Sequence, residues 1–106
     1  MSEPQPKVVA LEGNAKFQRL LAGAPETAGM KSGCVILKPG ESVGEHNTEA
    51  KEEAIIVLEG VAEVYTDKKA VFRVEKNHLI YIPPHTIHDI KNVSGQNLKY
   101  VYVVKD

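Results

Sequence analysis

The sequence has too few cysteines for a fold held by internal disulfides, because Cys34 is the only cysteine in 106 residues. Cys34 stands within the apolar run SGCVILKPG, which predicts a small buried side chain rather than a reactive thiol. Charge of one sign is also scarce: the formal net charge is −1, and acidic and basic residues are interspersed. Neither a nucleic-acid partner nor a membrane partner is therefore expected.

Long apolar runs are missing as well. None nears the length of a membrane span. The first residues, MSEPQPKVV, contain no apolar centre of the kind found in a signal peptide. These absences lead us to expect a cytoplasmic protein.

The sequence also has no helical pattern of convincing length and no internal repeat. From residue 33 onward, short apolar and β-branched segments alternate with turn residues, including a polar turn at 66–69. Asn77 stands in another turn and is predicted to adopt the left-handed conformation. Such a series predicts an all-β sandwich or barrel. The expected strands are 34–37, 52–59, 61–65, 70–74, 78–83, 87–91 and 98–104.

The length of the chain predicts one small domain. Residues 1–7 are polar, contain two prolines, and are predicted to be disordered or an extended arm. The folded domain is expected over 8–106, with 8–11 as a first short strand. Residues 17–21, FQRLL, are too few to distinguish helix from strand.

Two stretches carry a family resemblance. In GESVGEHNTEAKEEAIIVLEG, Gly40, His46, Glu53 and Gly60 have the spacing of the first cupin motif, and Thr48 stands where that motif has its second histidine. The first stretch therefore resembles the first motif of the cupin superfamily.

The second stretch, YIPPHTIHDIKN, resembles the second cupin motif. Pro83, His88 and Asn92 match it, while Asn77 and His85 occupy its two glycine positions. The motifs and the segment between them cover about half of the chain. The resemblance implies a small, single-domain cupin of the cupin 2 type, with a double-stranded β-helix, or jelly-roll, barrel over residues 8–106.

The same resemblance implies a metal site at His46, Glu53 and His88. Alternate side chains of a strand share one face. Glu53 would therefore face inward with Ile55, and His88 with Asn92. Two imidazoles and one carboxylate with open positions suit non-haem Fe(II) and also bind Mn, Ni, Co or Zn. The pattern leaves the identity of the metal open.

Four other residues are candidates near this site. Thr48 is a weak ligand in place of an imidazole. His85 is a possible fourth ligand, a base that lies beside the ligands without binding the metal, or a solvent-exposed side chain. Most tyrosines are expected to pack in the core, but Tyr81 or Tyr102 could present a hydroxyl to an interior pocket.

Several functions remain open for such a barrel. The first is a metal-dependent enzyme, such as an oxygenase or isomerase, acting on a small-molecule substrate. The second is a non-catalytic module that binds a small molecule such as a sugar or an acid. The third is a barrel whose metal site has degenerated. A homodimer is expected in each case, because a small open barrel exposes strand edges and part of an apolar face; residues 7–11 are the segment expected to cross to the partner.

Overall fold

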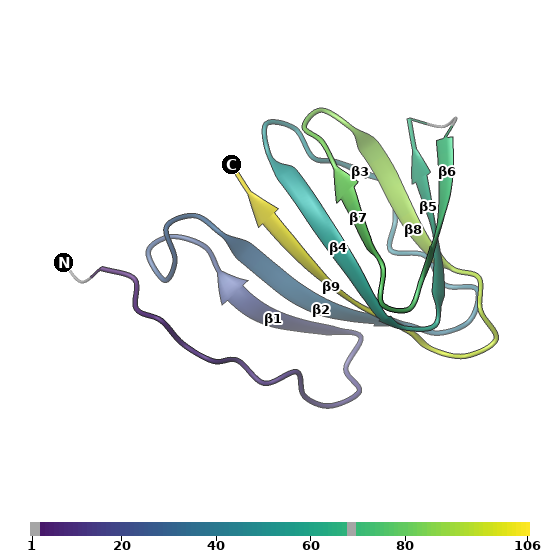
Figure 1. Ribbon diagram of the computed structural model, residues 1–106, viewed down its shortest axis with the longest axis horizontal. Coiled ribbons are helices and arrows are strands. Elements are labelled where there is room, and N and C mark those ends of the chain that lie inside the picture. Colours follow the sequence, from purple (N-terminus) through teal and green to yellow (C-terminus); the bar gives the residue numbers. More distant parts are fainter. Residues whose placement is uncertain (1–2, 68–69) are drawn as a thin grey trace.

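The computed structural model describes residues 3–67 and 70–106, which form nine strands and no helix (Figure 1). The all-β prediction is confirmed. Among these residues there is thus no helix that could cross a membrane. The predicted arm at 1–7 and the predicted turn at 66–69 each lie partly outside the described residues. The strands are β1 (Phe17–Ala22), β2 (Lys31–Leu37), β3 (His46–Asn47), β4 (Glu52–Glu59), β5 (Val61–Thr66), β6 (Ala70–Glu75), β7 (Leu79–Ile82), β8 (Ile87–Asn92) and β9 (Leu98–Lys105).

The strands form two antiparallel sheets. The larger sheet has the order β1-β2-β9-β4-β7, and the smaller has the order β3-β8-β5-β6. Consecutive strands β3 and β4 therefore lie in different sheets, and β8 joins the short strand β3 to β5. Figure 1 shows β5, β6 and β8 on one side of the molecule and β1, β2 and β9 on the other. This crossing of the chain between two sheets is the jelly-roll arrangement.

The core forms where the inner faces of the two sheets meet. Because side chains alternate along a strand, every second residue faces this core. Along β4, Glu53, Ile55 and Val57 are buried, while Glu52 on the opposite face is exposed. Along β8, the buried positions are again every second residue. The predicted inward faces of both strands are confirmed. The core cluster contains Val35, Leu37, Ile55, Val57, Ala62, Val64, Val74, Ile82, Ile90, Leu98 and Tyr100.

The N-terminal segment differs from the prediction. Residues 8–11 form no strand, and Val8 is 99% exposed. The side-chain amide of Gln18 on β1 holds this segment: it accepts a hydrogen bond from Glu12 N–H and donates one to the Ala10 carbonyl. Residues 8–11 are thus held by hydrogen bonds from one side chain, not by backbone hydrogen bonds to a neighbouring strand. The predicted strand is wrong. Residues 17–21, ambiguous in the sequence, belong to the edge strand β1.

Left-handed backbone occurs at the four glycine positions of the two cupin-like motifs. Gly40 and Gly60 have φ of 83° and 80°, and Asn77 and His85 have φ of 69° and 57°. The predicted left-handed conformation of Asn77 is confirmed. His85 keeps the same conformation, which a residue other than glycine adopts only at a cost. The turns of both motifs are therefore preserved although two of the glycines are replaced.

Candidate metal centre

His88 and His46 face each other across two strands of the smaller sheet. His46 on β3 is the direct antiparallel partner of His88 on β8. Their ring centroids are 4.3 Å apart with the ring planes at 67°. His88 is almost fully buried, with 1% of its surface exposed, whereas His46 is exposed at the end of the barrel. The strand register alone therefore brings two imidazoles together.

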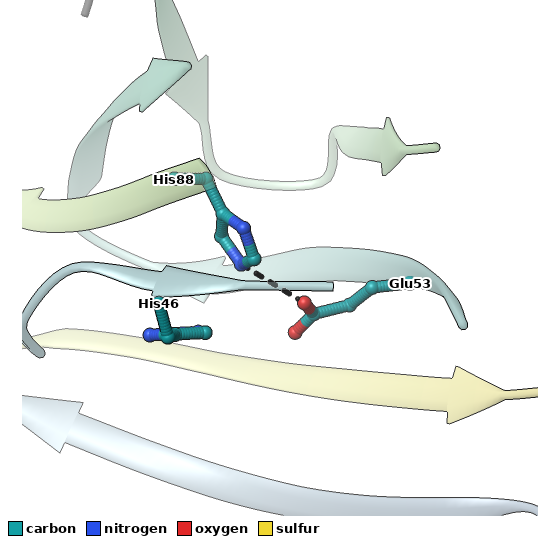
Figure 2. Close-up of side chains that lie close together, drawn as sticks. All are labelled: His46, Glu53 and His88. Carbon is teal, nitrogen blue, oxygen red and sulfur yellow. Dashed lines mark ion pairs between the residues drawn. The ribbon is translucent and has the colours of Figure 1, made fainter. Parts of the chain in front are cut away.

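Glu53 reaches the same point from the other sheet. It is buried on β4, and its Oε1 lies 3.0 Å from His88 Nε2. Figure 2 shows the Glu53 carboxylate and the His88 ring pointing toward each other, with His46 beside them. One ligand-type atom from each of the three residues lies within 4.8 Å of the others. The structure thus brings together the three residues that the sequence singled out.

Backbone carbonyls orient both imidazole rings. His46 Nδ1 lies 3.0 Å from the Gly44 carbonyl oxygen, and His88 Nδ1 lies 3.2 Å from the Thr86 carbonyl oxygen. A carbonyl oxygen only accepts, so each Nδ1 carries the hydrogen and donates it. In the neutral ring, Nε2 then bears a lone pair and is free to act as a ligand. Outer hydrogen bonds of this kind commonly fix metal-binding histidines.

The buried Nε2 of His88 has no hydrogen-bond partner among the described residues. The carboxylate of Glu53 is 3.0 Å away, and the two form an ion pair only when Nε2 carries a proton. Buried polar atoms rarely stay unpaired. Two atoms bound at about 2.1 Å and at right angles to one ion lie about 3.0 Å apart, which matches the observed separation. The residues present therefore fit a divalent metal.

The charge of Glu53 also acts on His88. Burial is the largest single influence on the pKa of His88 and lowers it. The Glu53 carboxylate, the Thr86 carbonyl and the charge of Asp89 act in the opposite direction and outweigh burial, so the pKa is raised. A proton on Nε2 would remove the repulsion between its lone pair and the carboxylate oxygen, and a metal cation can replace that proton.

A cavity of about 320 Å³ adjoins this group. Most of its wall is apolar or aromatic, and His46 and Glu53 form part of its polar surface. This volume is near the lower end of the range for small-molecule sites. Its lining residues are Phe17, Val35, Val43, His46, Asn47, Thr48, Lys51, Glu53, Ile90, Tyr100, Tyr102 and Val104.

Thr48 lines the cavity, but its hydroxyl is already engaged. Its Oγ1 donates to the Pro83 carbonyl at 2.8 Å and accepts from Thr86 N–H at 3.0 Å. Thr48 therefore connects the loop after β3 to the turn before β8. His85 in that turn is exposed and does not join the three-residue group. Of its alternative roles, the solvent-exposed one fits the structure.

The tyrosines correct the sequence analysis. Tyr81 is 54% exposed on the outer face of β7, where its hydroxyl donates to Glu52 Oε1 at 2.6 Å. The prediction that Tyr81 faces the pocket is wrong, because Ile82 beside it points inward and neighbouring residues of a strand alternate. Tyr102 does line the cavity, and so does Tyr100, which the sequence suggested only as core packing. The shared face of Leu98, Tyr100 and Tyr102 was the available signal.

Burial also affects the two cavity tyrosines and Cys34. Burial is the main cause that raises the pKa of Tyr100 and of Tyr102, and the nearby Glu53 charge adds to it. Both phenols are therefore protonated hydrogen-bond donors at neutral pH. Cys34 is buried, as predicted, and burial raises the pKa of its thiol.

Two proteins of known name have sequences similar to this chain. A protein named polyketide synthase CurC from Streptomyces cyaneus is 31% identical over 112 aligned residues, covering 96% of this chain and 71% of that protein. Mannose-1-phosphate guanylyltransferase RfbM from Salmonella typhimurium is 34% identical over 70 residues, covering 66% of this chain. The match spans only 14% of the guanylyltransferase.

Solved structures have the same fold. A cupin 2 conserved barrel domain protein from Salinispora arenicola superposes with a TM-score of 0.74 and 26% identity, covering all of this chain and 90% of the other. A Bacillus halodurans protein has a TM-score of 0.84 at 20% identity, covering 96% of this chain and 82% of the other. The sequence model of the family described as "Cupin domain" matches residues 33–104. The chain belongs to the cupin family and contains a small domain of the cupin 2 type.

Proposed function

We propose that His46, Glu53 and His88 hold one divalent transition metal. The observation that carries this proposal is the buried Nε2 of His88, which has no hydrogen-bond partner among the described residues and lies 3.0 Å from a carboxylate oxygen. Without a cation, two electron-rich atoms would face each other in a buried site. Either a metal ion or a proton removes that repulsion, but only a metal ion would also be bound by His46.

Two histidines and one carboxylate favour Fe(II), and Mn, Ni, Co or Zn are the alternatives. Such an ion supplies Lewis acidity or a binding position for oxygen. The backbone carbonyls of Gly44 and Thr86 hold the two rings in one tautomer. The apolar cavity wall excludes water, and Glu53 keeps a negative charge buried. The Thr48 hydroxyl is hydrogen-bonded to Pro83 and Thr86. It would therefore not serve as a ligand, and its position at the metal would stay open.

We propose that the cavity binds a small organic molecule beside this metal. The similarity to a polyketide synthase over 96% of this chain favours a compound of the polyketide type, with carbonyl or enol oxygens on an apolar skeleton. The apolar wall, including Val35, Ile90 and Val104, suits such a skeleton better than a sugar. An oxygenase or isomerase reaction is the proposed activity.

A non-catalytic binding protein is the alternative. The observation that favours it is the scarcity of acid and base groups in the cavity outside the three candidate ligands: among the described lining residues, only Lys51 and the two tyrosines titrate. Measuring substrate turnover and oxygen uptake with the metal-loaded protein separates the two functions. Binding of the small molecule with neither substrate turnover nor oxygen uptake would favour the alternative.

Metal analysis of untagged protein tests the metal proposal. We expect about one equivalent of a transition metal in the native protein and loss of most of it in His88→Ala. His78→Ala is the matched control, because His78 is exposed and also has its Nδ1 beside the carbonyl of the residue two before it, Lys76. His85→Ala should also keep its metal. Stoichiometric metal in His88→Ala would contradict the assignment.

We also propose that the protein is a homodimer formed through the outer face of the larger sheet. The central outward positions of β4 and β9 are apolar, with Ala54 and Ile56 paired with Val103 and Val101, while Glu52 and Lys105 stand at the end of this face. Leu79 on β7 pairs with Ile56 and is 58% exposed. Antiparallel sheets usually present polar residues to water, so a second copy of this face is the proposed cover.

A further inference from the structure

The hydroxyl groups of the four tyrosines fall into two classes. Tyr65 and Tyr81 each donate to a carboxylate, Glu63 and Glu52 respectively. Tyr100 and Tyr102 line the cavity, and neither hydroxyl has a hydrogen-bond partner among the described residues. The two tyrosines without a protein partner are thus the two that line the cavity.

Tyr100 is the more buried of the unpartnered pair, with 2% of its surface exposed. It lies on β9, the central strand of the larger sheet, between Val35 of β2 and Val57 of β4. The apolar neighbours offer its hydroxyl nothing to bond with. Its hydroxyl oxygen is not fully enclosed, so an acceptor in the cavity, either water or a bound molecule, can pair with it.

Gly33 makes room for the second tyrosine. It is the direct partner of Tyr102 on β2. A Cβ at Gly33 would lie 2.7 Å from Cε1 of Phe17, 2.7 Å from Cε2 of Tyr102 and 2.8 Å from the Tyr102 hydroxyl oxygen. At distances this short the rings of Phe17 and Tyr102 would have to shift. The absence of a side chain at Gly33 therefore lets the Tyr102 ring lie across β2.

Phe17 completes this side of the cavity. Its ring stacks on Tyr102, with centroids 6.5 Å apart and planes at 21°. Phe17 is 47% exposed, so it stands at the edge of the cavity. The missing side chain at Gly33 thus leaves the space in which the rings of Tyr102 and Phe17 lie.

We propose that Tyr100 and Tyr102 form a hydroxyl pair that binds an oxygen acceptor of a small, mostly apolar carbonyl or carboxylate compound in this cavity. The pair donates hydrogen bonds, and the apolar wall of Val35, Ile90 and Val104 accepts the carbon skeleton. A sugar would leave several hydroxyls against that wall without partners. The proposal rests on the proposed function only in using the same cavity as the ligand site.

A series of three probes of similar shape tests the pair. Acetophenone carries a carbonyl, benzoate a carboxylate, and toluene no acceptor. With full-length protein, we expect acetophenone or benzoate to bind more tightly than toluene in NMR or calorimetric titrations. Tyr100→Phe should weaken the binding of that acceptor probe by about tenfold, the value of one hydrogen bond, and leave toluene unchanged. Tyr81→Phe is the matched control and should change none of the three.

Thermal unfolding gives a second measurement. Tyr100→Phe removes a hydroxyl without a protein partner, so the unliganded variant should be at least as stable as the native protein. A lower unfolding temperature would show that the hydroxyl has a structural partner and would overturn the proposal. Equal affinity of native protein and Tyr100→Phe for acetophenone and benzoate, or no binding of any probe, would also overturn it.

Metal analysis of the same samples separates the two proposals. If a protein without metal still selects acetophenone or benzoate through Tyr100, the hydroxyl pair stands and the metal assignment fails. If a metal-loaded protein binds all three probes equally, the metal assignment stands and the hydroxyl pair fails. Gly33→Ala should weaken all three probes, because its Cβ displaces the rings of Phe17 and Tyr102.

Discussion

His46 and His88 are direct cross-strand partners, yet one is exposed and the other is almost completely buried. The difference arises because β3 is a two-residue strand at the edge of its sheet, while β8 lies between β3 and β5. One ring can thus move toward a ligand, whereas the other is fixed by the core. The two histidines should therefore respond differently to substitution.

Replacing each histidine separates metal binding from stability. Both His46→Ala and His88→Ala should lose most of the metal. His46→Ala should change the free energy of unfolding of the metal-free protein by less than about 0.5 kcal/mol, as exposed substitutions usually do. His88→Ala leaves a buried space and should cost about 1–3 kcal/mol. Denaturant unfolding in the presence of a chelator measures both values, and equal costs would contradict the difference in burial.

Glu53→Gln should lower the pKa of His88 in the metal-free protein. In the native protein Glu53 helps raise that pKa above its ordinary value of about 6.5. Without the carboxylate, burial dominates and disfavours the charged ring. Proton NMR titration of the imidazole measures the shift, and an unchanged pKa would show that Glu53 does not interact with His88.

The same pair predicts how stability depends on pH. A pKa that is higher in the folded than in the unfolded protein adds stability below the unfolded value of about 6.5. That contribution is lost as the pH rises through the raised folded pKa. The stability difference between the native protein and Glu53→Gln should therefore shrink as the pH increases from 6 toward alkaline values. Denaturant unfolding at several pH values measures it.

Thr48→Val should destabilise the protein by about 1–3 kcal/mol, because it leaves Pro83 C=O and Thr86 N–H without their partner. Thr48→Ser keeps the oxygen and should cost less than about 1 kcal/mol. Comparing the unfolding midpoints tests the connection between the two loops. Equal unfolding midpoints for Thr48→Val and Thr48→Ser would show that the Thr48 hydroxyl contributes nothing to stability.

Gly60→Ala and Gly40→Ala separate backbone strain from steric clash. Both glycines have positive φ, so alanine should cost about 1–2 kcal/mol at either site. At Gly60 the added Cβ would also lie 2.6 Å from the Asn97 carbonyl oxygen, whereas Gly40 has open space. Gly60→Ala should therefore be the less stable variant by at least about 1 kcal/mol. A larger loss for Gly40→Ala would contradict this.

Ile56→Lys should convert the proposed dimer into a monomer. Ile56 lies at the centre of the outer apolar face, between Val101 and Leu79. Val71→Lys is the matched control, because Val71 is 54% exposed on β6 of the other sheet. Light scattering at micromolar concentration should give a dimer mass for the native protein and the control only. A monomer mass for the native protein would contradict the proposal.

From residue 34 onward, the sequence by itself determined every strand except the two-residue β3, and it singled out the three candidate ligands. Period-two alternation predicted the inward direction of Glu53 and His88, because each lies in a strand with one buried face. The two motifs added His46, which no periodicity could identify in a two-residue strand. These features are local, so neighbouring residues suffice to predict them.

Only the tertiary structure decided what surrounds those ligands. Whether Thr48 binds a metal or holds a turn depends on Pro83 and Thr86, which come from a distant part of the chain. The shape of the cavity depends on Gly33 meeting Phe17 and Tyr102, which three strands bring together. The pairing of β1 with β2, and of β2 with β9, is a property of the whole sheet. Contacts between residues so far apart follow from strand register, which the sequence of one strand does not contain.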